Sequence, residues 1–119
     1  MPEAKTFTGG CHCGRVRYET SADLERVITC NCSMCQKRGS MLTFVPAAAF
    51  KLQSGEDALT DYRFNKNQIA HLFCEDCGIE SFARGRMPDG TEMVAINVRC
   101  LDEVDISALT PKAVDGRSF

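Results

Sequence analysis

Seven of the eight cysteines fall into three short clusters, and these clusters are the part of the sequence best suited to chemistry. The central cluster, CNCSMC at residues 30–35, places three thiols within six positions. A CHC pair lies upstream at residues 11–13, and a CEDC pair lies downstream at residues 74–77. Thiols at this density are typical of a metal site, a disulfide cluster or a reactive centre. We interpret the clusters as two zinc sites, one closed and one open.

The two outer pairs predict a structural zinc site with Cys11, Cys13, Cys74 and Cys77 as its ligands. Structural zinc takes four ligands in a tetrahedron, commonly from two short thiol pairs that lie on separate turns. The site would close a loop of about 60 residues, so that metal-binding free energy becomes folding free energy. Glycines flank both pairs, and tight turns around a metal need the backbone angles that glycine adopts. The alternatives are disulfides or unligated thiols.

The central cluster predicts a second zinc, held by Cys30, Cys32 and Cys35. Catalytic zinc sites characteristically have three protein ligands and an exchangeable fourth position, which a substrate can enter. Two alternatives remain open. A fourth protein ligand would close the site, and a metal-free cluster could form a disulfide or act as a redox sensor if its thiols had low pKa values.

Three other residues are candidates for that fourth ligand: Cys100, His12 and His71. Cys100 shares one face of a predicted strand at 92–100 with apolar residues, which favours a buried, unreactive thiol. His12 stands between two proposed ligands, so in an extended segment it points away from their metal. His71 lies on the strand face opposite Cys74, which favours a packed or surface histidine.

Length and composition predict a single domain over residues 1–119, because 119 residues with 44% hydrophobic content suit one modest core. The first ten residues carry no apolar run of the kind that a secretory signal needs, and no later stretch is long enough to span a bilayer. We therefore expect the reducing cytoplasm and no membrane association. In that compartment clustered thiols are more often metal ligands than disulfides.

The charge balance disfavours nucleic acid as a partner. The formal net charge is −2, and seven ligand thiolates with two Zn²⁺ would bring it to about −5. The chain has no tryptophan, and Lys37-Arg38 is its longest basic cluster. The sequence leaves the oligomeric state open.

The predicted architecture is mostly β, made of short antiparallel strands pinned by zinc knuckles, with one to three short helices. Alternating patterns and turn residues predict strands at residues 6–8, 15–20, 25–29, 40–45, 59–64, 68–74, 79–84 and 92–100. Residues 34–38, 46–50 and 105–109 are predicted as short helices, and 65–67 as a hairpin connection. A turn is expected at Gly9-Gly10, and the final residues of the chain are expected to be frayed.

The chain resembles the glutathione-dependent formaldehyde-activating enzyme family, which includes the centromere protein V domain. The resemblance is carried by GGCHCGRVRYE at residues 9–19, CNCSMC at 30–35, GS at 39–40 and FCEDCG at 73–78, within a match over about residues 6–102. It implies a β-tent fold, a structural zinc on Cys11, Cys13, Cys74 and Cys77, and a catalytic zinc on Cys30, Cys32 and Cys35. The implied activity is of carbon–sulfur lyase type, joining glutathione and formaldehyde into S-hydroxymethylglutathione.

A centre of three thiolates and one Zn²⁺ has a net charge of −1, which weakens the metal as a Lewis acid. Such a centre favours the binding of a substrate thiol over the formation of a hydroxide nucleophile. Our hypothesis is that glutathione or another small thiol binds there and its sulfur attacks an aldehyde carbon. Lys37 and Arg38 could neutralise the carboxylates of the thiol, or could simply form a solvated helix face. The alternative function is a non-catalytic, zinc-stapled binding module.

Overall fold

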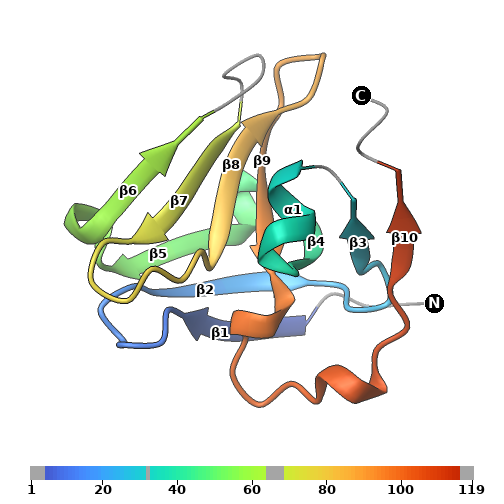
Figure 1. The fold of residues 1–119 in the computed structure, drawn as a ribbon, viewed down its shortest axis with the longest axis horizontal. Coiled ribbons are helices and arrows are strands. Elements are labelled where there is room, and N and C mark those ends of the chain that lie inside the picture. The colour runs from blue at the N-terminus through green and yellow to red at the C-terminus, as the bar shows by residue number, and fades with distance from the viewer. Residues whose placement is uncertain (1–4, 32, 64–68, 116–119) are drawn as a thin grey trace.

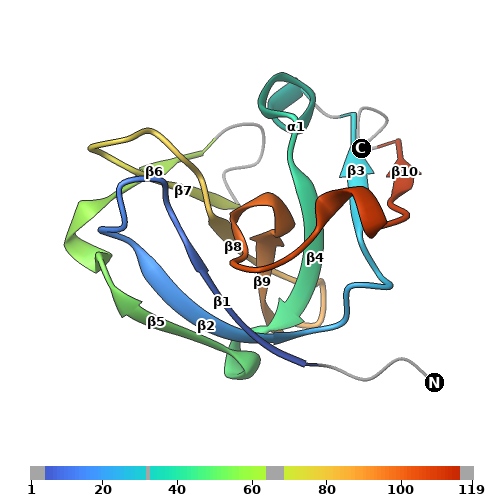
Figure 2. The ribbon, with the colours of Figure 1, turned by 90° about the horizontal axis from the view of Figure 1, so that it is seen from below.

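The computed structural model describes residues 5–31, 33–63 and 69–115, which form two β-sheets joined by short helices (Figure 1). The two sheets meet at an angle like the sides of a tent (Figure 2). The prediction of a mostly β protein with a few short helices is confirmed. The predicted hairpin connection at 65–67 and Cys32 lie outside the described residues.

The small sheet has three antiparallel strands in the order β1 (Lys5–Gly10), β2 (Arg17–Ala22) and β5 (Phe50–Ser54). We predicted a helix up to residue 50 and no strand after it. A 3₁₀-helix, η1 (Ala47–Ala49), does end there, but Phe50 begins a strand. Phe50 is buried and Leu52 half-buried, with exposed polar residues between and after them. This apolar–polar–apolar alternation covers only three residues. It is too short to predict a strand from the sequence without knowledge of the strand that pairs with it.

The large sheet has seven strands. In spatial order they are β10 (Lys112–Val114), β3 (Ile28–Cys30), β4 (Met41–Pro46), β9 (Glu92–Asn97), β8 (Phe82–Arg86), β7 (Ala70–Cys74) and β6 (Leu59–Tyr62). Neighbouring strands are antiparallel except β10 and β3, which are parallel. Residues 112–114, for which no strand was predicted, therefore form an edge strand, and the final four residues lie outside the described residues. The pairing of residues 112–114 is with a strand more than 80 positions away, which a three-residue segment cannot reveal.

In the described part of the chain, five short helices connect the strands: α1 (Ser33–Arg38), η1, η2 (Glu56–Ala58), η3 (Val98–Cys100) and η4 (Ile106–Ala108). The predicted end of α1 at residue 38 is confirmed, since the following Gly39 has a φ of +70° and its N–H donates to the Cys35 carbonyl at 2.9 Å. The predicted strand at 92–100 is too long. It ends at Asn97, whose side chain accepts from the Arg99 N–H at 3.2 Å and caps η3.

Several strands begin later than predicted. β2 begins at Arg17 and β8 at Phe82, because the preceding residues complete the turns that carry cysteines. β3 begins at Ile28, because the Asp23 carboxylate accepts from the Glu25 N–H at 3.0 Å and holds a turn there. Turn hydrogen bonds of this kind override the hydrophobic alternation on which the predictions depended.

Gly9 and Gly10 do not form the predicted turn but end β1. A Cβ at Gly10 would lie 2.0 Å from the Val16 carbonyl oxygen, and one at Gly9 would lie 2.8 Å from the Cys100 carbonyl oxygen. Glycine is thus required here by the close approach of other backbone segments rather than by a positive φ.

The core lies between the two sheets and is centred on three aromatic rings. Tyr18 of β2, Phe50 of β5 and Phe82 of β8 are buried, with ring centroids 4.7 to 5.8 Å apart. Val16 and Tyr18, the apolar residues that alternate with charged ones in the strand predicted at 15–20, are both fully buried. The Tyr18 hydroxyl donates to the Ser81 carbonyl at 3.3 Å, which ties the small sheet to the large one.

Replacing Tyr18 by phenylalanine should lower the free energy of unfolding by about 0.5–1.5 kcal/mol, the usual net worth of one hydrogen bond. The cost stays small because the ring cluster remains and the Ser81 carbonyl keeps the Asn97 N–H at 3.0 Å. Urea denaturation of the metal-loaded protein measures the difference. A loss above about 3 kcal/mol would show that the hydroxyl does more than join the sheets.

Candidate metal centre and the second cysteine cluster

The first thiol pair lies on the turn between β1 and β2. The Cys11 N–H donates to the Val16 carbonyl at 3.1 Å, and the Val16 N–H donates to the Cys11 Sγ at 3.3 Å. Gly14 has a φ of +84°, which glycine adopts without steric cost, and its N–H donates to the Cys11 carbonyl at 3.3 Å. The turn brings Cys11 and Cys13 side by side, with their sulfurs 3.5 Å apart.

The second thiol pair repeats this turn after β7. The Cys74 N–H donates to the Ile79 carbonyl at 3.0 Å, five positions ahead, as Cys11 does to Val16. Gly78 has a φ of +78°, and its N–H donates to the Cys74 carbonyl at 2.8 Å. The predicted pair of cysteine knuckles is therefore present.

The sulfurs of Cys11, Cys13, Cys74 and Cys77 all lie within 4.8 Å of one another. The Cys13 and Cys74 sulfurs are 3.7 Å apart, and the sulfurs of a tetrahedral zinc tetrathiolate with Zn–S of about 2.3 Å are roughly 3.8 Å apart. A disulfide would need about 2.05 Å, and these four cysteines are not bridged. The four side chains therefore fit a single tetrahedral metal ion, and we call them the four-cysteine centre.

Without a metal, the four thiols cannot all ionise, because adjacent thiolates repel one another. Burial disfavours the Cys77 thiolate, but the backbone N–H groups of Cys13 and Ile79 and the neighbouring thiols lower the pKa of Cys77 to about 6. The Arg15 N–H favours the Cys13 thiolate, but hydrogen bonding with the Cys11 thiol helps to raise the pKa of Cys13 to about 12. Metal loading at neutral pH must therefore release protons from this centre.

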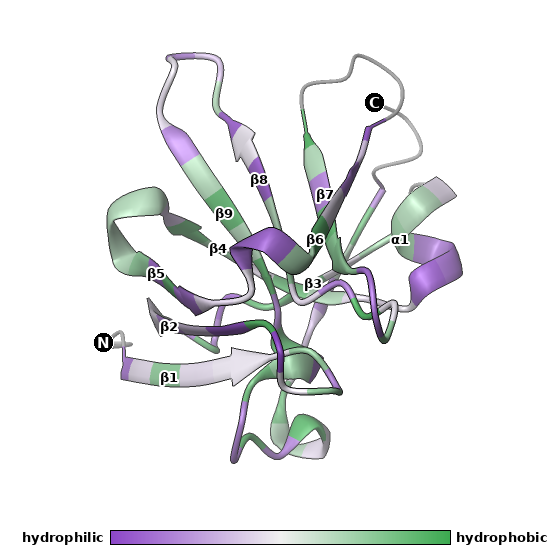
Figure 3. Ribbon diagram, turned by 90° about the vertical axis from the view of Figure 1, so that its left-hand side faces the viewer, coloured by the Kyte–Doolittle hydropathy of each residue, from purple (hydrophilic) through white to green (hydrophobic). Residues whose placement is uncertain are grey.

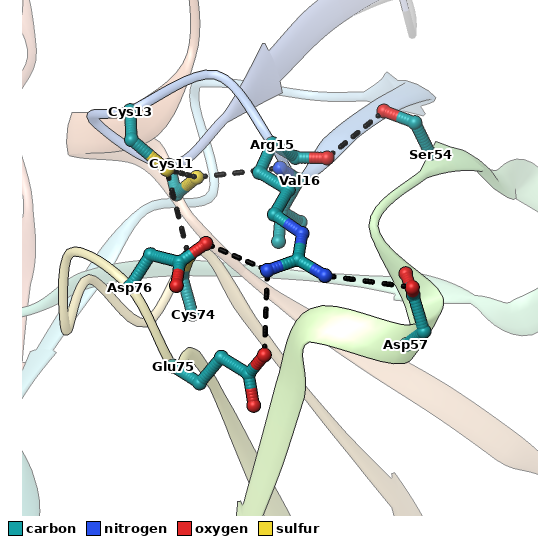
Figure 4. Close-up of polar contacts among 9 residues, drawn as sticks. All are labelled: Cys11, Cys13, Arg15, Val16, Ser54, Asp57, Cys74, Glu75 and Asp76. Atoms are coloured by element: carbon teal, nitrogen blue, oxygen red, sulfur yellow. Dashed lines mark hydrogen bonds and ion pairs between the residues drawn. The ribbon is translucent and has the colours of Figure 1, made fainter.

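Arg15 joins the two knuckles, a contact that the sequence analysis did not identify (Figure 4). Its guanidinium donates to Asp76 at 2.7 Å and to Glu75 at 3.3 Å, and it lies 3.5 Å from Asp57 of η2. The hydrogen bond from Arg15 to Asp76 raises the pKa of Arg15 further. The sequence did contain a signal for this contact, because the positive charge in CHCGR and the negative charges in CEDC are opposite in sign. Because these groups are 40–84% exposed, water screens each of these ion pairs strongly.

Cys30 and Cys35, the two described members of the second cysteine cluster, lie on the other face of the large sheet. Cys74 shares its face of β7 with Leu72, toward the core between the sheets. Cys30 ends β3 on the same face as Ile28, which pairs with Leu42 of β4, and this face points away from the core. We call it the outer face. α1, which carries the buried Cys35, lies against it (Figures 1 and 2).

A row of side chains crosses the outer face from β4 to β6. The strand register places the following residues side by side: Phe44, Ala95, Ala83, His71 and Tyr62. The two aromatic residues at its ends are 51% and 47% exposed, whereas His71 in the row is buried. The outer face thus combines exposed apolar side chains with a buried imidazole. The second half of α1 beside it is hydrophilic (Figure 3).

A buried carboxylate stands between this row and α1. Arg38 Nη1 donates to Glu80 Oε1, and the Glu80 side chain is only 5% exposed. His71 Nδ1 lies 3.5 Å from Glu80 Oε2. Arg38, which we predicted to face a substrate carboxylate, is thus already paired with a protein carboxylate, while Lys37 is exposed. The role of Lys37 and Arg38 toward a substrate stays a prediction.

The three candidates for the fourth ligand of the second cluster lie outside the four-cysteine centre. Whether one of them completes the second cluster stays a prediction, because Cys32 lies outside the described residues. Among residues 5–31, 33–63 and 69–115, the ligand group found contains only the four cysteines of the centre. His12 is exposed, and His71 lies on the outer face. Cys100 is half-buried on η3, donates to the Glu80 carbonyl at 3.8 Å, and has its pKa raised to about 11 by burial, which keeps it a neutral thiol.

Comparisons with known proteins match the part of the chain that carries the cysteine motifs. A family model described as glutathione-dependent formaldehyde-activating enzyme matches residues 6–115, nearly the whole chain. The chain belongs to this family. A crystal structure of a Rhodobacter sphaeroides protein, determined as a structural-genomics target, matches this GFA-family chain with a TM-score of 0.79 and 28% sequence identity. The match covers 89% of this chain and 97% of that one, and the resemblance inferred from the cysteine motifs is confirmed.

The GFA family has formaldehyde-activating activity that depends on glutathione, so small molecules of this kind are its substrates at the family level. The four-cysteine centre of this member can hold a metal ion. Within the described ranges, no helix is both long and apolar enough to cross a membrane.

A surface ion pair next to the first knuckle gives a pH-dependent prediction. Arg17 and Thr8 donate to the Asp102 carboxylate and lower the pKa of Asp102. The stability from this pair is present above about pH 4, the ordinary Asp pKa, and is lost as the pH falls through the lowered value. Because the side chains are 35% and 42% exposed, Asp102→Asn should cost less than about 1 kcal/mol at pH 7. In urea titrations, the difference between the two proteins should shrink toward zero at acid pH.

Proposed function

We propose that this chain is a zinc-dependent enzyme of carbon–sulfur lyase type that joins a small thiol, such as glutathione, to an aldehyde, such as formaldehyde. One observation carries the proposal most strongly. In a chain of the glutathione-dependent formaldehyde-activating family, Cys74 of the four-cysteine centre and Cys30 of the second cluster lie on opposite faces of one sheet. The first group joins the two knuckles of the scaffold, and this leaves the second group for chemistry.

Zinc is the metal proposed for both groups, since sulfur ligands in a tetrahedral arrangement favour it. Cys11, Cys13, Cys74 and Cys77 would hold a structural ion. Cys30, Cys32 and Cys35 would hold a second ion, which when bound would favour the thiolate form of an incoming thiol. Seven reduced cysteines also support the cytoplasm as the compartment.

The proposed reaction is an addition without any change of oxidation state. The sulfur of the thiol attacks the carbonyl carbon, and a carbon–sulfur bond forms. The S–H bond of the thiol breaks, the π electron pair of the carbonyl moves to its oxygen, and that oxygen takes up one proton in place of the one that the thiol has lost. The exposed Lys37 on α1 is our candidate for the carboxylates of glutathione, and Arg38 keeps further N–H donors beyond the one that Glu80 accepts.

The test is a titration of glutathione into protein loaded with cobalt in place of zinc. We expect millimolar glutathione to alter the visible absorption of cobalt, and formaldehyde to be consumed in a parallel assay. Cys35→Ser should lose the spectral response while the four-cysteine centre keeps its tetrathiolate absorption. Unchanged spectra of the parent protein at millimolar thiol would contradict the proposal.

A second candidate function is a binding module, which the exposed Phe44, Tyr62 and Ile69 favour, since they are 47–51% exposed. In this case the zinc ions would only stabilise the scaffold that presents this face. Partner binding retained after Cys32→Ser, together with no aldehyde turnover by the parent protein, would support it.

A further inference from the structure

Glu80 occupies a position held firmly by the core. It follows the second knuckle by two residues and precedes β8. Its carbonyl accepts from Asn97 Nδ2 at 3.1 Å and from the Cys100 thiol at 3.8 Å. The next carbonyl, of Ser81, accepts from the Tyr18 hydroxyl and from the Asn97 N–H. The backbone at Glu80 is therefore fixed to both β9 and the small sheet.

The side chain of Glu80 is directed away from this anchor, to α1. Glu80 is 6% exposed as a residue, and its Oε1 accepts from Arg38. Oε2 lies 3.5 Å from His71 Nδ1 and makes no hydrogen bond with the described residues. A buried carboxylate is costly unless a cation or donor compensates it, and removing one partner leaves the other uncompensated. The Arg38–Glu80 pair is thus strongly coupled to the position of α1.

α1 depends on such a contact. It has six residues, too few for a helix that is stable in isolation. Arg38 is its last residue and lies one turn after Cys35, so the two side chains lie on the same side of the helix. Holding Arg38 therefore also holds Cys35 in place relative to Cys30 on β3.

We infer that Glu80 is a positioning residue for the second cysteine cluster: through Arg38 it fixes α1 and Cys35 against the outer face. The part of the inference that concerns the use of Cys35 in catalysis rests on the proposed function. Glu80 also links the two cysteine groups, because it lies only two residues after the knuckle of Cys74 and Cys77. The four-cysteine centre then organises the second cluster across the sheet, in addition to stabilising the fold.

The test is Glu80→Gln, which keeps the shape and removes the charge. The metal-loaded protein is treated with iodoacetamide, and the alkylation of each cysteine is followed by mass spectrometry. We expect Cys35 to react about tenfold faster or more, because local opening of α1 becomes more frequent, while Cys11 and Cys74 stay protected. Amide hydrogen exchange of α1 should speed up in parallel.

Two further variants separate positioning from general stability. Asp76→Asn removes an exposed carboxylate of the same knuckle, which pairs with Arg15 and not with α1, and should leave Cys35 protected. Glu80→Gln combined with Arg38→Gln removes both charges, so the folding stability should recover while Cys35 stays reactive. This double variant carries the test if Glu80→Gln does not fold.

The inference is overturned if Cys35 in the double variant is as protected as in the parent protein. The labelling does not depend on turnover, so its result stands even if no thiol and aldehyde pair is consumed. If the parent protein is active and Cys35 labelling is unchanged in the variants, only the role of Glu80 is contradicted and the proposed reaction stands. An inactive parent with faster labelling in the variants would uphold the role of Glu80 and contradict only the proposed reaction.

Discussion

Cys77→Ser is expected to remove the metal of the four-cysteine centre and to unfold the protein. The sulfurs of Cys77 and its three partners lie within 4.8 Å of one another, and the two knuckles are 61 positions apart in the chain, counted from Cys13 to Cys74. Structural zinc binds zinc-finger peptides with about 10–16 kcal/mol of apparent free energy at neutral pH. Since whole domains are stable by only about 5–15 kcal/mol, losing even part of this free energy leaves no stable native state.

The measurement combines elemental analysis with thermal unfolding followed by circular dichroism. The zinc content should fall by about one ion per chain, with loss of the cooperative transition. Cys100→Ser is the matched control, because Cys100 lies outside the centre and its thiol only donates to the Glu80 carbonyl. It should keep the zinc and lose about 1 kcal/mol at most. A folded Cys77→Ser protein without zinc in this centre would show that the fold does not depend on the metal.

Cys35→Ser should abolish the addition of thiol to aldehyde and leave the fold intact. Cys35 is buried on α1 at the outer face, apart from the four-cysteine centre, so its loss does not disturb the scaffold. Serine has a similar size but binds zinc poorly in place of a thiolate. We expect kcat/KM to fall by a factor of about 100 or more, equivalent to about 2.7 kcal/mol of transition-state stabilisation.

Steady-state kinetics with glutathione and formaldehyde, together with zinc analysis, test this second prediction. About one zinc per chain should remain, in the four-cysteine centre. Ser33→Ala serves as the control, since Ser33 is an exposed residue at the start of the same helix. It should change kcat/KM by less than about threefold, as exposed substitutions usually do. Turnover by Cys35→Ser equal to that of the parent protein would remove the second cluster from the mechanism.

The four-cysteine centre was predictable because its determinants are local. Each thiol pair lies within four positions, next to a glycine that takes a positive φ in the structure, at Gly14 and Gly78. Short spacing and a turn residue restrict the geometry of each knuckle before any other part of the chain is considered. The stop of α1 at Gly39 and the burial of Tyr18 were predictable for the same reason.

The Arg38–Glu80–His71 arrangement could not be predicted. Its members come from α1, from the segment before β8 and from β7, and in the sequence each resembles an ordinary surface or packed residue. A glutamate after a cysteine knuckle carries no local sign of burial. Only the packing of α1 on the outer face removes its carboxylate from water and pairs it with Arg38.

The sequence by itself determined which cysteines belong together, since their spacing restricts them to two turns and one cluster. The tertiary structure decided on which side of the large sheet each group lies. Side chains alternate along a strand, and the face that Cys30 and Cys74 use depends on the register of β3 with β4 and of β7 with β8. Register is set by pairing between segments far apart in the chain, so the spacing of cysteines contains no information about it.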